Sequence, residues 1–146
     1  MKLIKQPNNW SCTATAVAML LDCEIKDIFN WVGHDGSAII FPDLPDPSCR
    51  KGIHIQEIID IVPLVPIEYE PWQTPNGEDE FLVFTDYKDR FYNHLFGNPG
   101  LLVGVAKDHW HTVAWNGSLV YDPNGTIYLY CDCKINIQTF YKIKSF

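Results

Sequence analysis

Residues 109–122, HWHTVAWNGSLVYD, give the most direct indication of how the second half of the chain folds. Two runs of strand-forming residues flank the pair Asn116-Gly117, and this dipeptide in such a setting is the strongest short-range signal of a β-hairpin. With Asn116 and Gly117 as the two central residues of the turn, His111 lies directly opposite Asp122. Residues in that relation have Cβ atoms about 4.5–5.5 Å apart, so we expect their side chains to form a hydrogen bond.

Further strands are predicted on both sides of this hairpin. Residues 101–106, LLVGVA, form a short apolar run typical of a buried strand. The sequence DPNG at 122–125 marks a second turn, and residues 126–132, TIYLYCD, are expected to form the next strand. The chain after residue 100 is therefore predicted to be an antiparallel sheet.

The first hundred residues carry helical periodicity instead. Ala14, Val17, Ala18 and Leu21 recur at the spacing of one buried helix face. The helices predicted from such spacing cover residues 13–22, 25–32, 53–62 and 81–96.

Two segments between these helices differ from them in composition. Residues 33–52 are rich in Pro, Gly and Asp, which indicates a long irregular loop of the kind that often borders a functional cleft. Residues 64–72 are expected to form a short strand whose prolines restrict it to a sheet edge. Helices followed by an antiparallel sheet predict an α+β fold, with N-terminal helices packed on a C-terminal sheet in a single domain, 1–146.

The composition narrows the classes of function. The 146 residues include 18 acidic and 11 basic side chains, a net charge of −7, so binding to nucleic acid or to an anionic membrane surface is not expected. The N-terminus has no sustained apolar stretch typical of an export signal. No segment reaches the roughly 18 apolar residues that span a bilayer. A cytoplasmic location is therefore predicted.

The cysteine content points to reduced thiols. Five cysteines are an odd number in a chain with no export signal, which disfavours a disulfide framework. Cys131 and Cys133 form a CxC pair, but no second pair of Cys or His residues completes a zinc site of ordinary spacing. The pair is explained more simply by packing on one face of a strand. A structural zinc site is therefore not expected.

Gln6 and Cys12 are separated by a short polar loop directly before the first predicted helix. A thiol at a helix N-terminus gains stabilisation of its thiolate from the helix dipole and the free N–H groups. A glutamine one loop upstream can donate to the oxyanion of an acyl-transfer intermediate. From this segment alone, a buried helical cysteine with a surface glutamine explains the pattern equally well.

The hairpin supplies the remaining candidate residues. His111 with Asp122 as its partner has the arrangement of a general base oriented by an acid, and we prefer His111 to His109 because of that partner. A packed strand histidine and a turn-opening aspartate are the alternatives. Trp10 and Trp110 adjoin these elements and are candidates for the substrate-binding walls of a cleft, although packing into the core is the simpler explanation of both.

These residues in this order resemble the papain-like cysteine peptidases, and more closely the C39-like peptidase family. The resemblance lies in the spacing of Gln6 and Cys12 and in His111-Thr-Val followed by Asp122-Pro. It covers both ends of the chain, while the middle matches only in outline. The family often has Asp-Cys-Gly at the nucleophile, where this chain has Ser-Cys-Thr; the difference leaves the subfamily and the substrate open.

The resemblance implies a papain-like fold and a cysteine peptidase that hydrolyses a peptide or isopeptide bond. It implies Cys12 as the nucleophile, His111 as the proton carrier, Asp122 as its orienter and Gln6 as an oxyanion donor, with a peptide or protein as substrate and no cofactor. One alternative is another thiol acyl-transfer reaction at the same site, such as that of a transglutaminase, deamidase or amidase. Another is a non-catalytic protein-binding module on the same scaffold.

Overall fold

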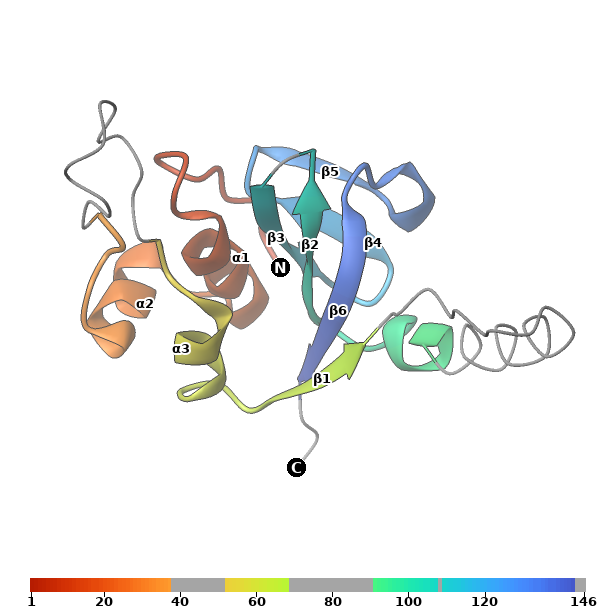
Figure 1. The fold of residues 1–146 in the computed structure, drawn as a ribbon, viewed down its shortest axis with the longest axis horizontal. Coiled ribbons are helices and arrows are strands. Elements are labelled where there is room, and N and C mark those ends of the chain that lie inside the picture. The colour runs from red at the N-terminus through yellow and green to blue at the C-terminus, as the bar shows by residue number, and fades with distance from the viewer. Residues whose placement is uncertain (38–51, 69–90, 108, 144–146) are drawn as a thin grey trace, which may run out of the picture.

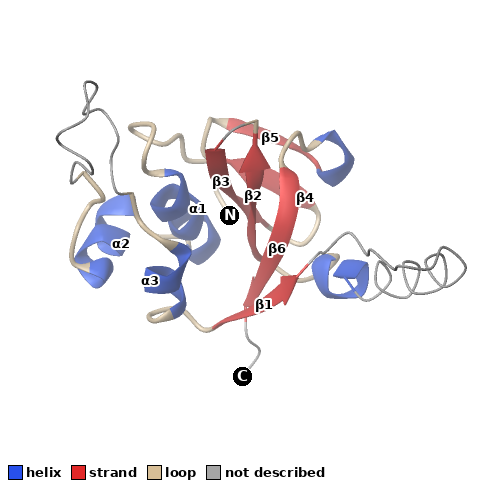
Figure 2. Cartoon of the chain, in the orientation of Figure 1, coloured by secondary structure: helices blue, strands red, loops and turns tan. Residues whose placement is uncertain are grey.

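A computed structural model describes residues 1–37, 52–68, 91–107 and 109–143 of the protein. Helices lie beside a six-stranded antiparallel sheet, so the predicted mixture of helices and antiparallel sheet is confirmed at this level (Figures 1 and 2). The elements, in chain order, are α1 Cys12–Leu21, α2 Ile25–Val32, α3 Ile55–Ile59, β1 Leu64–Glu68, β2 Gly100–Ala106, β3 His109–Trp115, β4 Leu119–Asp122, β5 Thr126–Leu129 and β6 Asn136–Ile143.

The predicted helices are found with adjusted ends. α2 has the predicted bounds, and α1 begins and ends one residue earlier than expected. α3 ends at Ile59 rather than at residue 62, because the chain tightens there: Ile61 and Val62 both donate to the carbonyl of Ile58. Of the helix predicted at 81–96, residues 91–95 are helical, while 81–90 fall outside the described residues. Most of the loop predicted at 33–52 also lies outside them.

The strand order in the sheet is β1-β6-β2-β3-β4-β5, with every neighbouring pair antiparallel. β1 lies at one edge, as its proline predicted, and β5 lies at the other. The segment predicted as a strand at 126–132 is shorter than expected, because Tyr130–Asp132 turn into a short 3-10 helix. The central strands β2, β3 and β4 form the part of the sheet from which the candidate site is built.

β6 is a central strand that the sequence analysis did not predict. A bulge at Gln138 explains the omission: Val103 pairs with Thr139, whereas the next residue of β2, Gly104, pairs with Ile137. The extra residue shifts the alternation of inward and outward side chains. Ile137 and Phe140 are therefore both buried in the same cluster although they stand three residues apart. A strict two-residue pattern is absent from the sequence for this reason.

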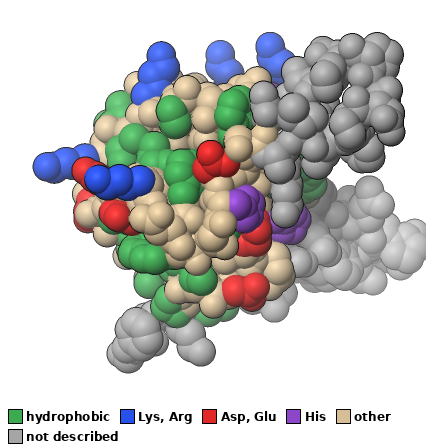
Figure 3. All heavy atoms as spheres, turned by 90° about the vertical axis from the view of Figure 1, so that its left-hand side faces the viewer, with side chains coloured by type: hydrophobic (Ala, Val, Ile, Leu, Met, Phe, Trp, Pro, Cys, Tyr) green, Lys and Arg blue, Asp and Glu red, His purple; other side chains and the backbone are tan. Residues whose placement is uncertain are grey.

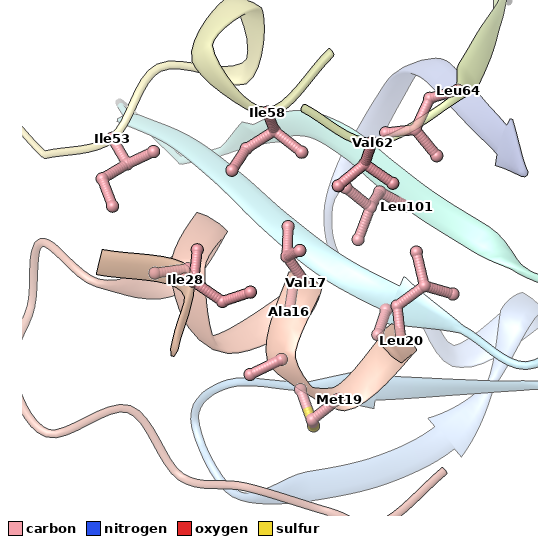
Figure 4. Close-up of a cluster of buried hydrophobic side chains, with 13 residues drawn as sticks. Ala16, Val17, Met19, Leu20, Ile28, Ile53, Ile58, Val62, Leu64 and Leu101 are labelled. Atoms are coloured by element: carbon pink, nitrogen blue, oxygen red, sulfur yellow. The ribbon is translucent and has the colours of Figure 1, made fainter. Parts of the chain in front are cut away.

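Each face of the sheet has its own hydrophobic core. Successive residues of a strand point to opposite faces, and Leu101 accordingly packs with the helices while Leu102 joins the other cluster. Figure 4 shows the helix-side cluster, where Val17 of α1, Ile28 of α2 and other labelled side chains meet Leu101. The small residues of α1 let the helix approach the sheet closely, and residues 13–20 of it are all buried.

The outer surface of the helices is mixed in character. Figure 3 shows hydrophobic side chains scattered among polar ones, with Lys side chains projecting at the top and at the left of the view and His next to acidic groups. His34 and Glu57 form such a pair, with Nε2 and Oε1 2.6 Å apart. Within the described parts of the chain, no helix has both the length and the apolar character needed to cross a membrane.

Candidate active site

The β3–β4 hairpin differs from the prediction in its register. Ala114 pairs with Tyr121 and Trp115 with Val120, so the prediction that His111 lies directly opposite Asp122 is wrong. The central residues of the turn are Gly117-Ser118 rather than Asn116-Gly117. Gly117, at the first central position, has a φ of 100°, a left-handed conformation that glycine adopts without steric cost.

Asn116 precedes this turn and stabilises it through its side chain. Asn116 Oδ1 accepts hydrogen bonds from the N–H groups of Ser118 at 2.9 Å and Leu119 at 2.7 Å. Asparagine commonly makes such bonds to the backbone two residues on. The Asn-Gly signal thus located the hairpin correctly but misplaced its centre by one residue.

The displaced register still brings His111 and Asp122 together. Moving the turn by one residue shifts the pairing by two, which keeps both side chains on the same face of the sheet. They become diagonal neighbours, a relation that long and aromatic side chains can still bridge. The Nε2 atom of His111 lies 2.8 Å from Oδ1 of Asp122, and the Asp122 residue is only 4% exposed.

The carboxylate of Asp122 receives three hydrogen bonds. Oδ1 accepts from His111 Nε2 and, at 3.0 Å, from the backbone N–H of Asn124, while Oδ2 accepts from the Tyr128 hydroxyl at 2.6 Å. Burial alone would raise the pKa of this carboxyl, but the donors outweigh burial and lower the pKa of Asp122 below its ordinary value. Asp122 therefore faces His111 as a fixed anion.

Cys12 is the first residue of α1 and interacts with the other side of the His111 ring. Burial alone would raise the pKa of Cys12. The hydrogen bond and charge of His111, the Thr112 backbone N–H and the Thr13 hydroxyl oppose burial and lower the pKa of the thiol. Because Nε2 of His111 is bound to Asp122, Nδ1 is the ring nitrogen left for the sulfur.

The pKa of the His111 imidazole is shifted in the opposite direction, upward. Burial disfavours its charged form, but the hydrogen bonds to Asp122 and Cys12 and the charges of both outweigh burial and raise the pKa of His111 to about 9. A thiol with a lowered pKa beside an imidazole with a raised pKa favours a thiolate–imidazolium pair. Such a pair is the reactive form of a nucleophilic cysteine.

A buried hydroxyl pair joins α1 to β3 at this point. Thr13 Oγ1 and Thr112 Oγ1 are 2.9 Å apart, and the two residues directly follow Cys12 and His111 in the sequence. The β3–β4 pairing begins only at Ala114. The Thr112 N–H is consequently outside that ladder, and its interaction with the Cys12 sulfur helps to lower the pKa of the thiol.

Gln6 approaches the same place from the N-terminal loop. Its backbone N–H donates to the carbonyl of Pro123 at 2.7 Å, which anchors the loop on the turn after Asp122. Asn8 shapes the remainder of the loop by accepting from the Trp10 N–H at 3.1 Å and the Ser11 hydroxyl at 2.6 Å. Gln6 Oε1 is buried and has no hydrogen-bond partner in the described part of the chain.

A cleft of about 670 Å³ is lined by all four candidate residues, Gln6, Cys12, His111 and Asp122. Trp110 also lines the cleft and is 63% exposed. The other tryptophan singled out in the sequence, Trp10, is half-buried and is not among the residues that line this cleft.

The competing histidine, His109, lies on the same face of β3 as predicted. It lines the cleft, and its ring centroid is 6.3 Å from that of His111. The hydrogen bond to Asp122 belongs to His111. The preference for His111 over His109 therefore agrees with the geometry.

Two parts of the site were missed by sequence reasoning. Tyr128 could have been found, because the DPNG turn pairs Asp122 with Thr126 and leaves Tyr128 on the same face two residues further along. No sequence pattern predicts the Thr13–Thr112 pair, because the contact arises from the packing of α1 on the sheet.

Four of the five cysteines lie in the described part of the chain. Cys12, Cys23, Cys131 and Cys133 are free thiols, and Cys49 lies outside the described residues. Among the residues that the structure describes, no group of three or more His, Cys, Asp and Glu side chains is placed to hold a metal ion.

In comparisons with known proteins, no family model matches the chain, and neither a curated protein nor a solved structure matches it. The interpretation of the cleft consequently depends on its own chemistry.

Proposed function

We propose that this protein is a cysteine-dependent acyl-transfer enzyme, and specifically a peptidase that hydrolyses a peptide or isopeptide bond. The observation that carries the proposal is the chain of contacts Cys12–His111–Asp122 in a solvent-accessible cleft. The resemblance to C39-like papain-like peptidases supports it from the sequence side. The order of elements, a nucleophile at the start of the first helix and its partners on the sheet, agrees with a papain-like fold.

In the proposed reaction the Cys12 thiolate attacks the carbonyl carbon of the substrate and forms a tetrahedral intermediate. The Gln6 side-chain amide and the Cys12 backbone N–H donate to the oxyanion, and one such donor is worth about 3–4 kcal/mol in a favourable case. His111 gives its proton to the leaving amine as the carbon–nitrogen bond breaks. A thioester to Cys12 remains.

Water then completes the reaction. Neutral His111 takes a proton from the water molecule as the oxygen attacks the thioester carbon, and the thiolate leaves. The products are a carboxylic acid and an amine, and the thiolate–imidazolium pair is restored. Asp122 holds the imidazole in one orientation throughout. Because the thiol must stay reduced, a reducing compartment such as the cytoplasm is the proposed location.

A labelling experiment tests the first requirement, an activated thiol. The protein is treated with limiting iodoacetamide at about pH 6, where ordinary thiols with a pKa near 8.5 are almost entirely protonated. We expect Cys12 to be alkylated before the other cysteines. Cys23 serves as an internal control, since burial and neighbouring carboxylates raise the pKa of its thiol.

Matched histidine variants complete the design. His111→Ala should abolish the selective alkylation of Cys12, whereas His109→Ala, two residues away on the same strand, should leave it close to the wild-type rate. Equal labelling of Cys12 and Cys23 would contradict the proposal. A profile of cleaved peptides, with Cys12→Ala as the inactive control, then separates hydrolysis from transfer to another amine.

A further inference from the structure

The hydroxyl of Tyr128 donates a hydrogen bond to Oδ2 of Asp122, the carboxylate oxygen that is not bound to His111. The phenol oxygen lies 2.6 Å from Asp122 Oδ2, the shortest of the three hydrogen bonds to that carboxylate. The ring of Tyr128 packs against the hydrophobic cluster on the side of the sheet away from α1. The Cys133 thiol lies 4.0 Å from the phenol oxygen. Tyr128 is half-buried and lines the cleft, so its hydroxyl meets Asp122 at the wall of the site.

We propose that Tyr128 is a positioning residue of the site, which draws charge from Asp122 and so keeps the His111 proton transferable. The inference builds on the proposed function for its catalytic meaning, but the contact itself does not depend on that function.

The single negative charge of Asp122 is shared among the three groups that donate hydrogen bonds to it. A carboxylate that accepts several hydrogen bonds shares its negative charge among the donors. It is therefore a weaker base, and it binds each donor less strongly. With Tyr128 on Oδ2, less charge remains on Oδ1 to hold the His111 imidazolium. A proton held too tightly is a poor general acid, because proton transfer is most efficient when the pKa of the acid lies near the working pH.

The Tyr128 phenol is suited to the role of donor because it does not ionise in the pH range in which His111 titrates. Burial and the adjacent Asp122 carboxylate raise the pKa of Tyr128 above its ordinary value. The hydroxyl therefore remains a donor over the whole range in which His111 titrates. Burial also raises the pKa of the neighbouring Cys133 thiol above its ordinary value.

Among the described residues, few titratable groups face His111, so the effect of Tyr128 can be isolated. Cys12 of α1 and Asp122 of β4 contact the ring, and His109 of β3 lies beside it. Tyr128 reaches His111 only through Asp122. Lys107, Asp132 and Lys134 also line the cleft, and all of them are left unchanged in the test.

The test measures the pKa of His111 directly, from the ring ¹⁵N chemical shifts of the full chain as a function of pH. In Tyr128→Phe the pKa should rise above the wild-type value of about 9, because Oδ1 regains the charge that the phenol withdrew. Tyr121→Phe is the matched control. Tyr121 is a half-buried tyrosine of β4 that packs on the helix side of the sheet, and its loss should leave the titration unchanged.

A second variant applies the opposite change without altering the shape of the site. A fluorinated tyrosine at position 128 is a more acidic phenol and a stronger donor, so the pKa of His111 should fall below the wild-type value. A merely structural role would lower thermal stability in both variants without moving the titration in opposite directions. An unchanged titration in either variant, or a shift of the same sign in both, overturns the inference.

The result is separable from the fate of the proposed function. If iodoacetamide shows no activated Cys12 but the two Tyr128 variants shift His111 in opposite directions, the acyl-transfer proposal fails and the assignment of Tyr128 stands. If Cys12 is activated and the titration does not respond to position 128, the assignment fails alone.

Discussion

The hydroxyls of Thr13 and Thr112 meet 2.9 Å apart inside the protein, one residue beyond Cys12 on α1 and one beyond His111 on β3. Both residues are almost fully buried. This contact connects the segment that carries the thiol to the segment that carries the imidazole. It therefore links the two halves of the proposed site in addition to the direct interaction between Cys12 and His111.

Replacing one partner of this pair should cost more than replacing both. Thr112→Val leaves the Thr13 hydroxyl buried without its partner, so we expect a loss of about 1–3 kcal/mol in the free energy of unfolding. The double variant Thr13→Val with Thr112→Val should recover part of that loss, because two apolar groups of the same shape can replace a hydrogen bond almost neutrally. Urea denaturation measures both. Strictly additive losses would mean that the hydroxyls do not interact.

Gln6 should affect acyl transfer but not alkylation. Gln6→Ala removes the proposed oxyanion donor, so turnover of a peptide substrate should fall about 10²- to 10³-fold. Alkylation by iodoacetamide builds no oxyanion, and the rate of Cys12 alkylation should stay close to that of the wild type. A parallel loss of both rates would show instead that Gln6 supports the fold of the loop before α1.

The His111–Asp122 pair should make stability depend on pH in a defined direction. The folded pKa of His111, about 9, is raised above its ordinary value of 6.5. The stabilisation is therefore complete below about pH 6.5 and is lost as the pH rises through about 9. Asp122→Asn removes the charge partner. The difference in unfolding free energy between wild type and Asp122→Asn should be large near pH 6 and smaller near pH 10.

The same comparison of wild type with Asp122→Asn can be made at acidic pH. Because the pKa of Asp122 is lowered in the folded protein, its contribution is present above its ordinary value of 3.8 and is lost as the pH falls through the folded value. A difference between wild type and Asp122→Asn that grows from neutral to alkaline pH would contradict the assigned ion pair.

Gly104 should be intolerant of any side chain. It pairs with His111 across β2 and β3, and a Cβ atom there would overlap the backbone carbonyl of Asn136 on β6. Gly104→Ala should lower the free energy of unfolding by about 1–3 kcal/mol, the usual cost of overpacking. It should also slow the alkylation of Cys12, because the strand that carries His111 moves.

Gly33→Ala is the control for that substitution. Gly33 ends α2 with a φ of 95° and has no other atom near its Cβ position, so alanine there meets only backbone strain. It should reduce stability while leaving the reactivity of Cys12 unaltered. Equal effects of the two substitutions on alkylation would show that the Gly104 contact has no bearing on the site.

Sequence reasoning was most successful where local rules act. Helix spacing located α1 and α2, and the Asn-Gly signal located the β3–β4 hairpin. The register was wrong by two residues, yet His111 and Asp122 remained on one face because only an odd displacement would have separated them. The four candidate residues consequently line one cleft, although their chemical roles stay proposals until the thiol is tested.

What was missed depends on contacts between distant segments. β6 was not predicted, and the bulge at Gln138, which interrupts the alternation of its buried side chains, exists only through pairing with β2. The Thr13–Thr112 contact depends on how closely α1 packs on the sheet. A single sequence contains no rule for either, since both follow from tertiary packing.

The turn at residues 122–125 has a consequence for how this protein can vary. Asp122 Oδ1 binds the Asn124 N–H within the turn and His111 outside it, while the carbonyl of Pro123 receives the Gln6 N–H. Surface turns usually accommodate inserted residues with little harm. Here a single inserted residue would displace the anion behind the histidine and the support of the glutamine loop together. We therefore expect natural or engineered length variation to be tolerated at the Gly117-Ser118 turn and to be eliminated at this one.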